Sequence, residues 1–315
     1  MRTLGAHGPT ISPVGLGGWQ AGGGRTWGPN SSDREVVSAL RTGFDAGADW
    51  IDTAEVYAQG RSEEIVGRAV APYPDVRVFT KVGPQPDGTG VRAAEVVRAA
   101  EGSLRRLGRD VLDLYQVHWR DHEVPIEETW TAMLGLVDRG LARWVGLSNV
   151  TREDLDACAR IGHVDSLQIQ GSLLHRSELD WALPRCAELG TGVICYGPLA
   201  YGLLGGHRDG GYTDWRSGGY GMDDFFVEEN FHRFFADDVT AEVGLAVSRV
   251  EAGAAELGLT AAQASLAWLL AQPGVTGVIA GSRNPAHILE NVSAGSVTLT
   301  PEQLVALEQG SVVAR

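Results

Sequence analysis

The sequence predicts a (β/α)8 (TIM) barrel with an N-terminal β-hairpin and a long loop after its seventh strand. Eight short β-branched or aliphatic runs recur along the chain, and helical patterns lie between them. The 315 residues, 43% of them hydrophobic, suffice for one such barrel or for two ordinary domains. Because strand–helix alternation builds a parallel sheet, eight units in a chain of this length favour a single barrel domain over residues 1–315.

The elements follow in chain order. Residues 1–13, MRTLGAHGPTISP, resemble a small hairpin that could plug the bottom of a barrel. The eight predicted strands are 14–18, 49–54, 76–81, 113–118, 144–149, 166–170, 192–197 and 277–282. Asp33 and Thr151 occupy predicted helix N-caps, and glycines occupy the predicted C-caps at Gly47, Gly108, Gly140 and Gly190.

The segment 198–238, after the seventh strand, is long and rich in glycine and aromatic residues. A connection of this length is usually a functional lid or a disordered loop, and its aromatic residues favour a lid. An open dinucleotide-binding sheet is the alternative fold. The stretch GLGGWQAGGG is glycine-rich, but it lacks the G-x-G-x-x-G spacing and does not lead directly into a helix.

Composition and charge exclude several functions. A net charge of −14 argues against nucleic-acid binding, which needs a clustered basic face. No run approaches eighteen apolar residues, and the start lacks the apolar region of a signal peptide. The three cysteines, Cys158, Cys186 and Cys195, are too few and too scattered for a disulfide framework or a zinc site. We therefore expect a cytoplasmic protein with no membrane segment and no metal requirement.

Lys81 is the only lysine among 26 basic Lys and Arg residues. In a chain biased toward arginine, a lysine is expected to survive where arginine cannot replace it. Arginine is planar, bulky and always protonated, whereas lysine is a compact charge whose pKa responds to burial. A surface lysine kept by chance is the alternative, so the surroundings of Lys81 must decide.

Polar side chains stand at the predicted carboxyl ends of neighbouring strands, where barrel enzymes place their chemistry. Asp52 and Tyr57 follow the second strand, Lys81 ends the third and His118 ends the fourth. Each of these residues alone would suit a cap or the core. Together they suit proton transfer to an oxygen that gains negative charge.

In this arrangement Asp52 keeps Lys81 protonated and Lys81 lowers the pKa of Tyr57. Tyr57 is then the general acid, and His118 orients the substrate oxygen.

At these residues the sequence resembles the aldo-keto reductase family, in a bacterial type with a long loop after the seventh strand. The matching stretches, DWIDTAEVYAQGRSEEIVGRAV, FTKVG, LDLYQVHW, PIEETWTAMLGLVDRGLARWVGLSN, GVICYGPLAYGLLGG and GVIAGSRNPAHILEN, occur in the family's order across about residues 10–295. The resemblance implies NADPH-dependent reduction of an aldehyde or ketone, a small carbonyl substrate, and catalytic roles for Asp52, Tyr57, Lys81 and His118.

The resemblance also implies a cofactor site. Trp19 and Asp52 would border the cofactor, and its nicotinamide would meet Ser148, Asn149, Gln168 and Tyr196. The pyrophosphate belt would comprise Gly197, Pro198, Leu199, Ala200, Gly202 and Leu204. The adenosine 2′-phosphate and adenine would lie against Gly281, Ser282, Arg283, His287, Glu290 and Asn291. Asn284 and Pro285 predict a helix N-terminus beside Arg283.

Some positions depart from the family's pattern. Gly171 replaces a frequent aromatic residue, which suggests open space near the cofactor. Arg120 replaces a frequent proline and is expected to reach toward the substrate mouth. His287 stands where Arg or Gln is commoner, so NADH remains possible beside NADPH. Cys195 is expected to be a buried small hydrophobe.

We expect the substrate pocket to be walled by Trp19, Trp27, Tyr57, His118 and Trp119, with lid aromatics such as Tyr201, Tyr212, Trp215 and Phe225. Two other functions stay open. Lys81 could form a Schiff base in a barrel aldolase, which would need no nicotinamide. Some relatives are nucleotide-sensing subunits of a membrane channel, but the sequence shows no partner surface that we can identify. The physiological substrate, the reaction direction and the oligomeric state are not predicted.

Overall fold

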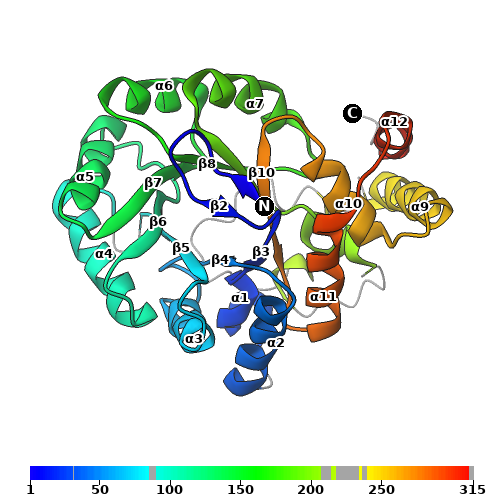
Figure 1. Cartoon of the computed structure of the whole chain (residues 1–315), viewed down its shortest axis with the longest axis horizontal. Helices are drawn as coiled ribbons and strands as arrows, with labels where there is room; N and C mark the ends of the chain where they lie inside the picture. The colour runs from blue at the N-terminus through cyan, green and yellow to red at the C-terminus, as the bar shows by residue number, and fades with distance from the viewer. Residues whose placement is uncertain (31, 85–89, 207–213, 218–233, 236–239, 312–315) are drawn as a thin grey trace.

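A computed structural model describes residues 1–30, 32–84, 90–206, 214–217, 234–235 and 240–311. Eight parallel strands close a barrel in the order β10-β3-β4-β5-β6-β7-β8-β9. Helices surround the strands, as Figure 1 shows in a view along the barrel. The strands are β3 (Val14–Gly17), β4 (Trp50–Asp52), β5 (Arg77–Val82), β6 (Leu112–Val117), β7 (Ala142–Ser148), β8 (Ser166–Gln170), β9 (Gly192–Tyr196) and β10 (Val275–Gly281). All eight predicted strands are confirmed, with small shifts at their ends.

The N-terminal hairpin is also confirmed. Strands β1 (Arg2–Thr3) and β2 (Thr10–Ile11) pair antiparallel and lie across the centre of the strand ring (Figure 1). Leu4 and Ile11 are fully buried and pack with Trp50 and Phe79 in a cluster separate from the larger core around the barrel. The hairpin therefore fills one end of the barrel and leaves the opposite end for chemistry.

The helices that cover the barrel are amphipathic or apolar and pack their buried faces on the strands. The longer ones are α2 (Asp33–Asp45), α3 (Arg61–Val70), α4 (Ala93–Leu107), α5 (Ile126–Asp138), α6 (Arg152–Ile161), α7 (Ser177–Leu189), α9 (Thr240–Glu256), α10 (Ala261–Leu270), α11 (Pro285–Ser293) and α12 (Pro301–Gly310). Short helical turns are η1 (Trp19–Gly22), α1 (Gly24–Trp27), η2 (Ala200–Gly205), η3 (Trp215–Ser217) and η4 (Ala294–Ser296). Within the described ranges, no helix has the length and apolar character needed to cross a bilayer.

Of the predicted helix caps, Thr151, Gly108 and Gly190 are confirmed. Helices α2 and α5 end one residue earlier than predicted, with Ala46 and Arg139 as C-caps directly before Gly47 and Gly140. Thr151 caps α6, and its hydroxyl accepts a hydrogen bond from the backbone N–H of Asp154. Asp33 was the wrong residue for the cap of α2, because Ser32 has the extended backbone of an N-cap and its hydroxyl accepts from Glu35 N–H. The Asp33 carboxylate instead pairs with Arg61 of α3, at 2.6 Å.

Candidate active site

A cavity of about 400 Å³ opens at the carboxyl ends of the strands, opposite the hairpin. Its size falls in the range of small-molecule sites, roughly 300–1,000 Å³. Asp52 from β4, Tyr57 from the following loop and His118 from the loop after β6 all border it. The structure thus brings these three predicted residues to one cavity.

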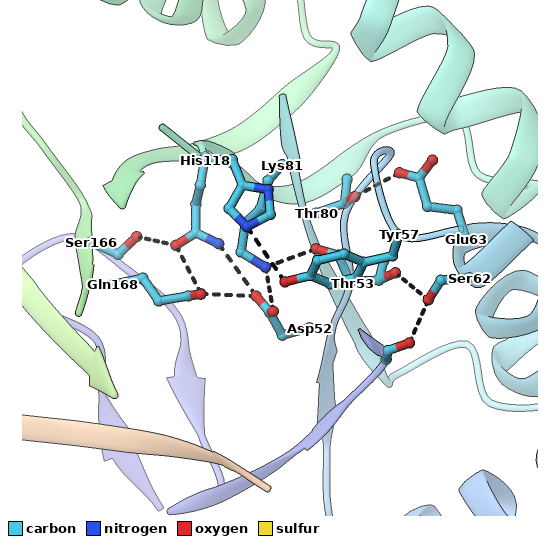
Figure 2. Close-up of polar contacts among 12 residues, drawn as sticks. Asp52, Thr53, Tyr57, Ser62, Glu63, Thr80, Lys81, His118, Ser166 and Gln168 are labelled. Carbon is cyan, nitrogen blue, oxygen red and sulfur yellow. Dashed lines mark hydrogen bonds and ion pairs between the residues drawn. The ribbon is translucent and has the colours of Figure 1, made fainter. Parts of the chain in front are cut away.

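Lys81 lies beneath this cavity, fully buried at the end of β5. Its ammonium donates hydrogen bonds to Asp52 Oδ1 and, over 2.9 Å, to the backbone oxygen of Thr53. Figure 2 shows the Lys81 ammonium with its dashed lines to Asp52 and Thr53, beside Tyr57. Lys81 Nζ lies 5.2 Å from the centre of the Tyr57 ring. The sole lysine is therefore a structural cation of the site, and the alternative of a chance surface lysine is wrong.

Burial and pairing act in opposite directions on this ion pair. Burial lowers the pKa of Lys81, and the neighbouring Asp52 carboxylate opposes that shift. Burial likewise raises the pKa of Asp52, against the effects of Lys81, Gln168 and Gln116. The hydrogen bonds between ammonium and carboxylate stabilise the charged forms of both groups.

The second oxygen of Asp52 is held by two amides. Gln168 Nε2 donates to Asp52 Oδ2 over 2.9 Å, and Gln116 Nε2 lies 3.5 Å from the same oxygen. Ser166 and Gln168 both donate to Gln116 Oε1, each at 3.4 Å. Gln116 was not among the site residues predicted from the sequence. Its place inside the strand run DLYQVH, two residues before His118, was the available signal.

Tyr57 and His118 meet at the floor of the cavity. The Tyr57 hydroxyl lies 3.4 Å from His118 Nε2, and the two rings meet nearly edge to face (Figure 2). Burial, with a smaller contribution from Lys81, holds the pKa of His118 well below its usual range. His118 is therefore neutral at pH 7, with its Nδ1 buried and without a hydrogen-bond partner among the described residues.

A tight turn fixes the direction of Tyr57. Ala58, Gln59 and Gly60 have φ values of 49°, 56° and 89°, a left-handed run that is unfavourable for the first two. The turn is closed by a hydrogen bond from Ser62 N–H to the Tyr57 backbone oxygen, at 3.3 Å. The Ser62 hydroxyl donates to the backbone of Gly18, at 2.6 Å.

A second buried network, also missed from the sequence, lies behind Lys81. Glu63, at the start of α3, is fully buried and accepts from the Thr80 hydroxyl at 2.6 Å. Arg106 of α4 pairs with the other Glu63 oxygen at 2.6 Å. These bonds tie the helix that follows the Tyr57 turn to the strand that carries Lys81.

The predicted nicotinamide residues lie on or directly after β7, β8 and β9, with Gln168 in the middle of β8. Asn149, Gln168 and Tyr196 border the cavity, and the Tyr196 hydroxyl donates to Asn149 Oδ1 over 2.7 Å. Asn149 Nδ2 donates to the backbone oxygen of His118 over 3.0 Å. The Ser148 hydroxyl is buried without a hydrogen-bond partner among the described residues. An unsatisfied buried hydroxyl is costly unless a bound group satisfies it.

The residues of the predicted pyrophosphate belt divide into two groups. Gly197, Pro198, Leu199 and Gly202 border the cavity. Ala200 and Leu204 are fully buried in the core, and neither is part of the cavity lining. Trp19, predicted to contact both cofactor and substrate, borders the cavity as well.

The predicted adenosine residues line the far part of the same cavity: Gly281, Ser282, Arg283, His287, Glu290 and Asn291. Asn284 caps α11 as expected, and its side-chain oxygen accepts from Ala286 N–H at 2.9 Å, with Pro285 following as the first helical residue. Burial lowers the pKa of Arg283. Its guanidinium points to backbone oxygens of residues 27–29, which the sequence did not predict.

Aromatic side chains wall the substrate end. Trp19, Trp27, Trp119 and Tyr201 border the cavity, while Trp215 is fully buried and stacks on Trp19 at 5.9 Å. Tyr212 and Phe225 lie outside the described residues. Asp214 and Arg216 also border the cavity and pair with each other at 2.8 Å. Neither residue was predicted from the sequence, because both lie in a connection without regular periodicity.

Two expectations about departures from the family's pattern are wrong. Arg120 is not part of the cavity lining, and Asp154 at the start of α6 binds its guanidinium. Gly171 opens no space, because a Cβ there would lie 3.2 Å from Cys195 Sγ and 3.4 Å from Leu179. Cys195 is buried, as expected, and burial raises the pKa of its thiol. It is therefore unsuited to act as a nucleophile.

Known proteins resemble the chain along most of its length. The family described as "Aldo/keto reductase family" matches residues 13–311. A probable voltage-gated potassium channel subunit beta of Arabidopsis thaliana is 32% identical over 327 residues, covering 98% of this chain and 95% of the relative. The aldo-keto reductase YhdN of Bacillus subtilis is 32% identical over 285 residues, covering 88% and 83%.

Solved structures of aldo-keto reductases and a glycerol dehydrogenase are also similar to the chain. An aldo-keto reductase from Klebsiella pneumoniae in complex with NADPH is 31% identical, with a TM-score of 0.75 over 98% of this chain and 95% of that one. A glycerol dehydrogenase from Gluconobacter oxydans has a TM-score of 0.82 at 28% identity, covering 98% and 94%.

Proposed function

The chain belongs to the aldo/keto reductase family and is an NAD(P)H-dependent oxidoreductase, and from this premise we propose that it reduces an aldehyde or ketone to the alcohol with NADPH. The observation that carries the proposal is the buried Lys81–Asp52 pair beneath Tyr57 and His118 at the edge of the cavity. Burying an ion pair costs desolvation free energy. A neighbouring general acid that becomes negatively charged needs a cation, and this need accounts for the buried pair.

The residues at the cavity fit the cofactor. Asn149 and Gln168 would hold the carboxamide, and Tyr196 would lie against the ring. The unsatisfied Ser148 hydroxyl, next to Asn149 but outside the cavity lining, would join them. Arg283 and the N-terminus of α11 would hold the 2′-phosphate, as cations and helix N-termini do. When bound, the reduced nicotinamide supplies the hydride.

The protein's own residues manage the proton. Neutral His118 donates a ring N–H to the substrate oxygen. This hydrogen bond orients the substrate oxygen beside the Tyr57 hydroxyl. Tyr57 donates its proton to that oxygen as negative charge develops there. The Lys81 ammonium, beside the ring, then stabilises the phenolate that Tyr57 becomes. Asp52 and its two amide donors keep the ammonium in place.

The Tyr57→Phe variant tests this assignment, because it removes the acidic proton and keeps the ring beside Trp19. We expect kcat for NADPH-dependent reduction of 4-nitrobenzaldehyde or methylglyoxal to fall by about 100-fold or more, the usual contribution of a general acid. Titration of NADPH binding by fluorescence should give the same Kd as the parent. Full turnover by the variant would exclude Tyr57 as the acid.

Nucleotide sensing for a partner protein is the second candidate, because a relative that matches almost all of this chain is described as a probable voltage-gated potassium channel subunit beta. In this case the chain would bind nucleotide and report its redox state to a partner. Tight NADPH binding without turnover of any compound in a panel of sugars, quinones, pyridoxal and small aldehydes would favour it over the reductase.

The Schiff-base alternative finds no support in the surroundings of Lys81. A nucleophilic lysine needs a neutral amine that reaches its substrate. Lys81 is instead fully buried, is not part of the cavity lining, and donates to Asp52 and Thr53.

A further inference from the structure

Arg283 joins two segments that are far apart in the sequence. It follows β10, and its side chain reaches the segment 27–30 after the short helix α1. Nη2 donates to the Trp27 backbone oxygen and Nη1 to Asn30 Oδ1, both at 3.0 Å. The backbone oxygens of Gly28 and Pro29 lie 3.4 Å from Nη1. We call these contacts the Arg283 clamp. It crosses the seam at which β10 pairs with β3 to close the barrel.

The clamped segment carries part of the substrate wall. Trp27 borders the cavity and is 5% exposed, and its ring meets Trp19 edge to face at 4.9 Å. Trp19 in turn lies 6.0 Å from the Tyr57 ring. Asn30 extends the clamp, because its Nδ2 donates to the backbone oxygen of Ala21 at 2.7 Å. Arg283 is thus linked through short contacts to the aromatic residues beside the proposed acid.

The charge of Arg283 remains available to a ligand. Every acceptor in the clamp is neutral, and in the described part of the chain no carboxylate lies within ion-pair distance of this guanidinium. Asp214, whose negative charge acts to raise the pKa of Arg283, already pairs with Arg216. A guanidinium has five N–H donors, so it can keep backbone oxygens on one side and face a phosphate on the other.

We propose that Arg283 is a positioning residue for the substrate wall: its guanidinium holds Trp27 against Trp19 and so shapes the part of the cavity that receives the carbonyl compound. This role is additional to the contact with the cofactor's 2′-phosphate, and it rests on the proposed reductase function. Losing Arg283 should therefore weaken substrate binding even with NADH, which carries no 2′-phosphate. A residue that only binds the phosphate would leave substrate binding with NADH unchanged.

Three variants separate the two roles in steady-state assays with 4-nitrobenzaldehyde and saturating NADH. Arg283→Ala should raise the KM for the aldehyde about fivefold or more, the factor that one lost hydrogen bond is worth, with a smaller change in kcat. Asn30→Ala loosens the clamp without removing the guanidinium. It should raise the same KM while leaving the ratio of the KM values for NADPH and NADH unchanged. Arg283→Lys, which keeps a cationic donor, should restore part of the loss.

Hydrogen–deuterium exchange of the nucleotide-free protein provides a readout independent of turnover. Amides of residues 19–30 should exchange faster in Arg283→Ala and Asn30→Ala than in the parent, whereas those of β7 should not change. The proposal is overturned if Arg283→Ala leaves both the exchange of residues 19–30 and the aldehyde KM with NADH at parental values. If the parent reduces no aldehyde, the proposed function fails, and the exchange result alone then decides whether the clamp exists.

Discussion

Lys81 stands where a compact cation is required. Its ammonium fits between Asp52 Oδ1 and the backbone oxygen of Thr53, and the whole side chain is fully buried. A guanidinium is planar and larger, and it spreads its charge over three nitrogens. At this position it would push against Asp52 and move the charge away from the Tyr57 ring. This explains how a chain that otherwise uses only arginine retains one lysine.

We therefore expect Lys81→Arg to keep the charge but lose the function. The kcat for 4-nitrobenzaldehyde should fall by about 100-fold or more, because the general acid loses the cation that stabilises its phenolate. NADPH should still bind, as a fluorescence titration can show, since Lys81 is not part of the cavity lining. Parental kcat in this variant would mean that the shape of the cation is unimportant and that the sole lysine needs another explanation.

At the residue scale, the sequence predicted side chains whose positions follow from strand ends. Asp52, Lys81 and His118 each lie within one residue of the carboxyl end of a strand, so barrel topology alone brings them together. Arg120 was predicted wrongly because it lies in a loop, and its direction depends on Asp154, which is distant in the chain. Gln116 was missed because its place inside a strand marks a buried polar residue but does not indicate which carboxylate the side chain contacts.

At the scale of elements, one ion pair connects the helices and the strand that support the site. Glu63 of α3 and Arg106 of α4 pair at 2.6 Å, and Thr80 of β5 donates to the same carboxylate. The Arg106 side chain is 28% exposed, whereas that of Glu63 is fully buried. The pair therefore fixes two helices against the strand that ends in Lys81, and Glu63 depends on Arg106 for its nearest cation.

Removing the cation should destabilise the fold. We expect Arg106→Ala to lower the free energy of unfolding by about 3 kcal/mol, because Glu63 is left as a buried carboxylate without its partner. Urea denaturation followed by circular dichroism measures the change. The double variant Arg106→Ala/Glu63→Gln removes the stranded charge, so it should recover part of the loss. A double variant no more stable than Arg106→Ala would show that the charge is not the cause.

The sequence predicted the elements better than their exact ends. Runs of apolar residues located all eight strands because burial on both faces of a parallel barrel demands them. Serine and aspartate are both favourable N-cap residues, so residue type does not decide between Ser32 and Asp33. The deciding contacts are the ion pairs of Asp33 with Arg61 and Arg68 of α3. The Glu63–Arg106 pair was unpredictable for the same reason. Charged residues on helices are typical of exposed positions, and these two meet only when the barrel has folded.

At the scale of the whole molecule, stability and chemistry occupy opposite ends of the barrel. The hairpin fills one end with Leu4 and Ile11, in one cluster with Trp50, Phe79 and other residues inside the barrel. The cavity and the Lys81–Asp52 pair lie at the carboxyl ends of the strands. Residues at the hairpin end should therefore affect folding without affecting turnover, as in other barrels of this kind.

Leu4→Ala tests this separation. Leu4 is fully buried, so its truncation should lower the free energy of unfolding by about 3 kcal/mol through lost burial and a residual cavity. Thr3→Ala, at the exposed position of β1 directly before Leu4, should change it by less than about 0.5 kcal/mol. Urea denaturation gives both values, and NADPH-dependent turnover below the transition should equal that of the parent in each variant. A loss of kcat in folded Leu4→Ala would mean that the hairpin end is coupled to the active site.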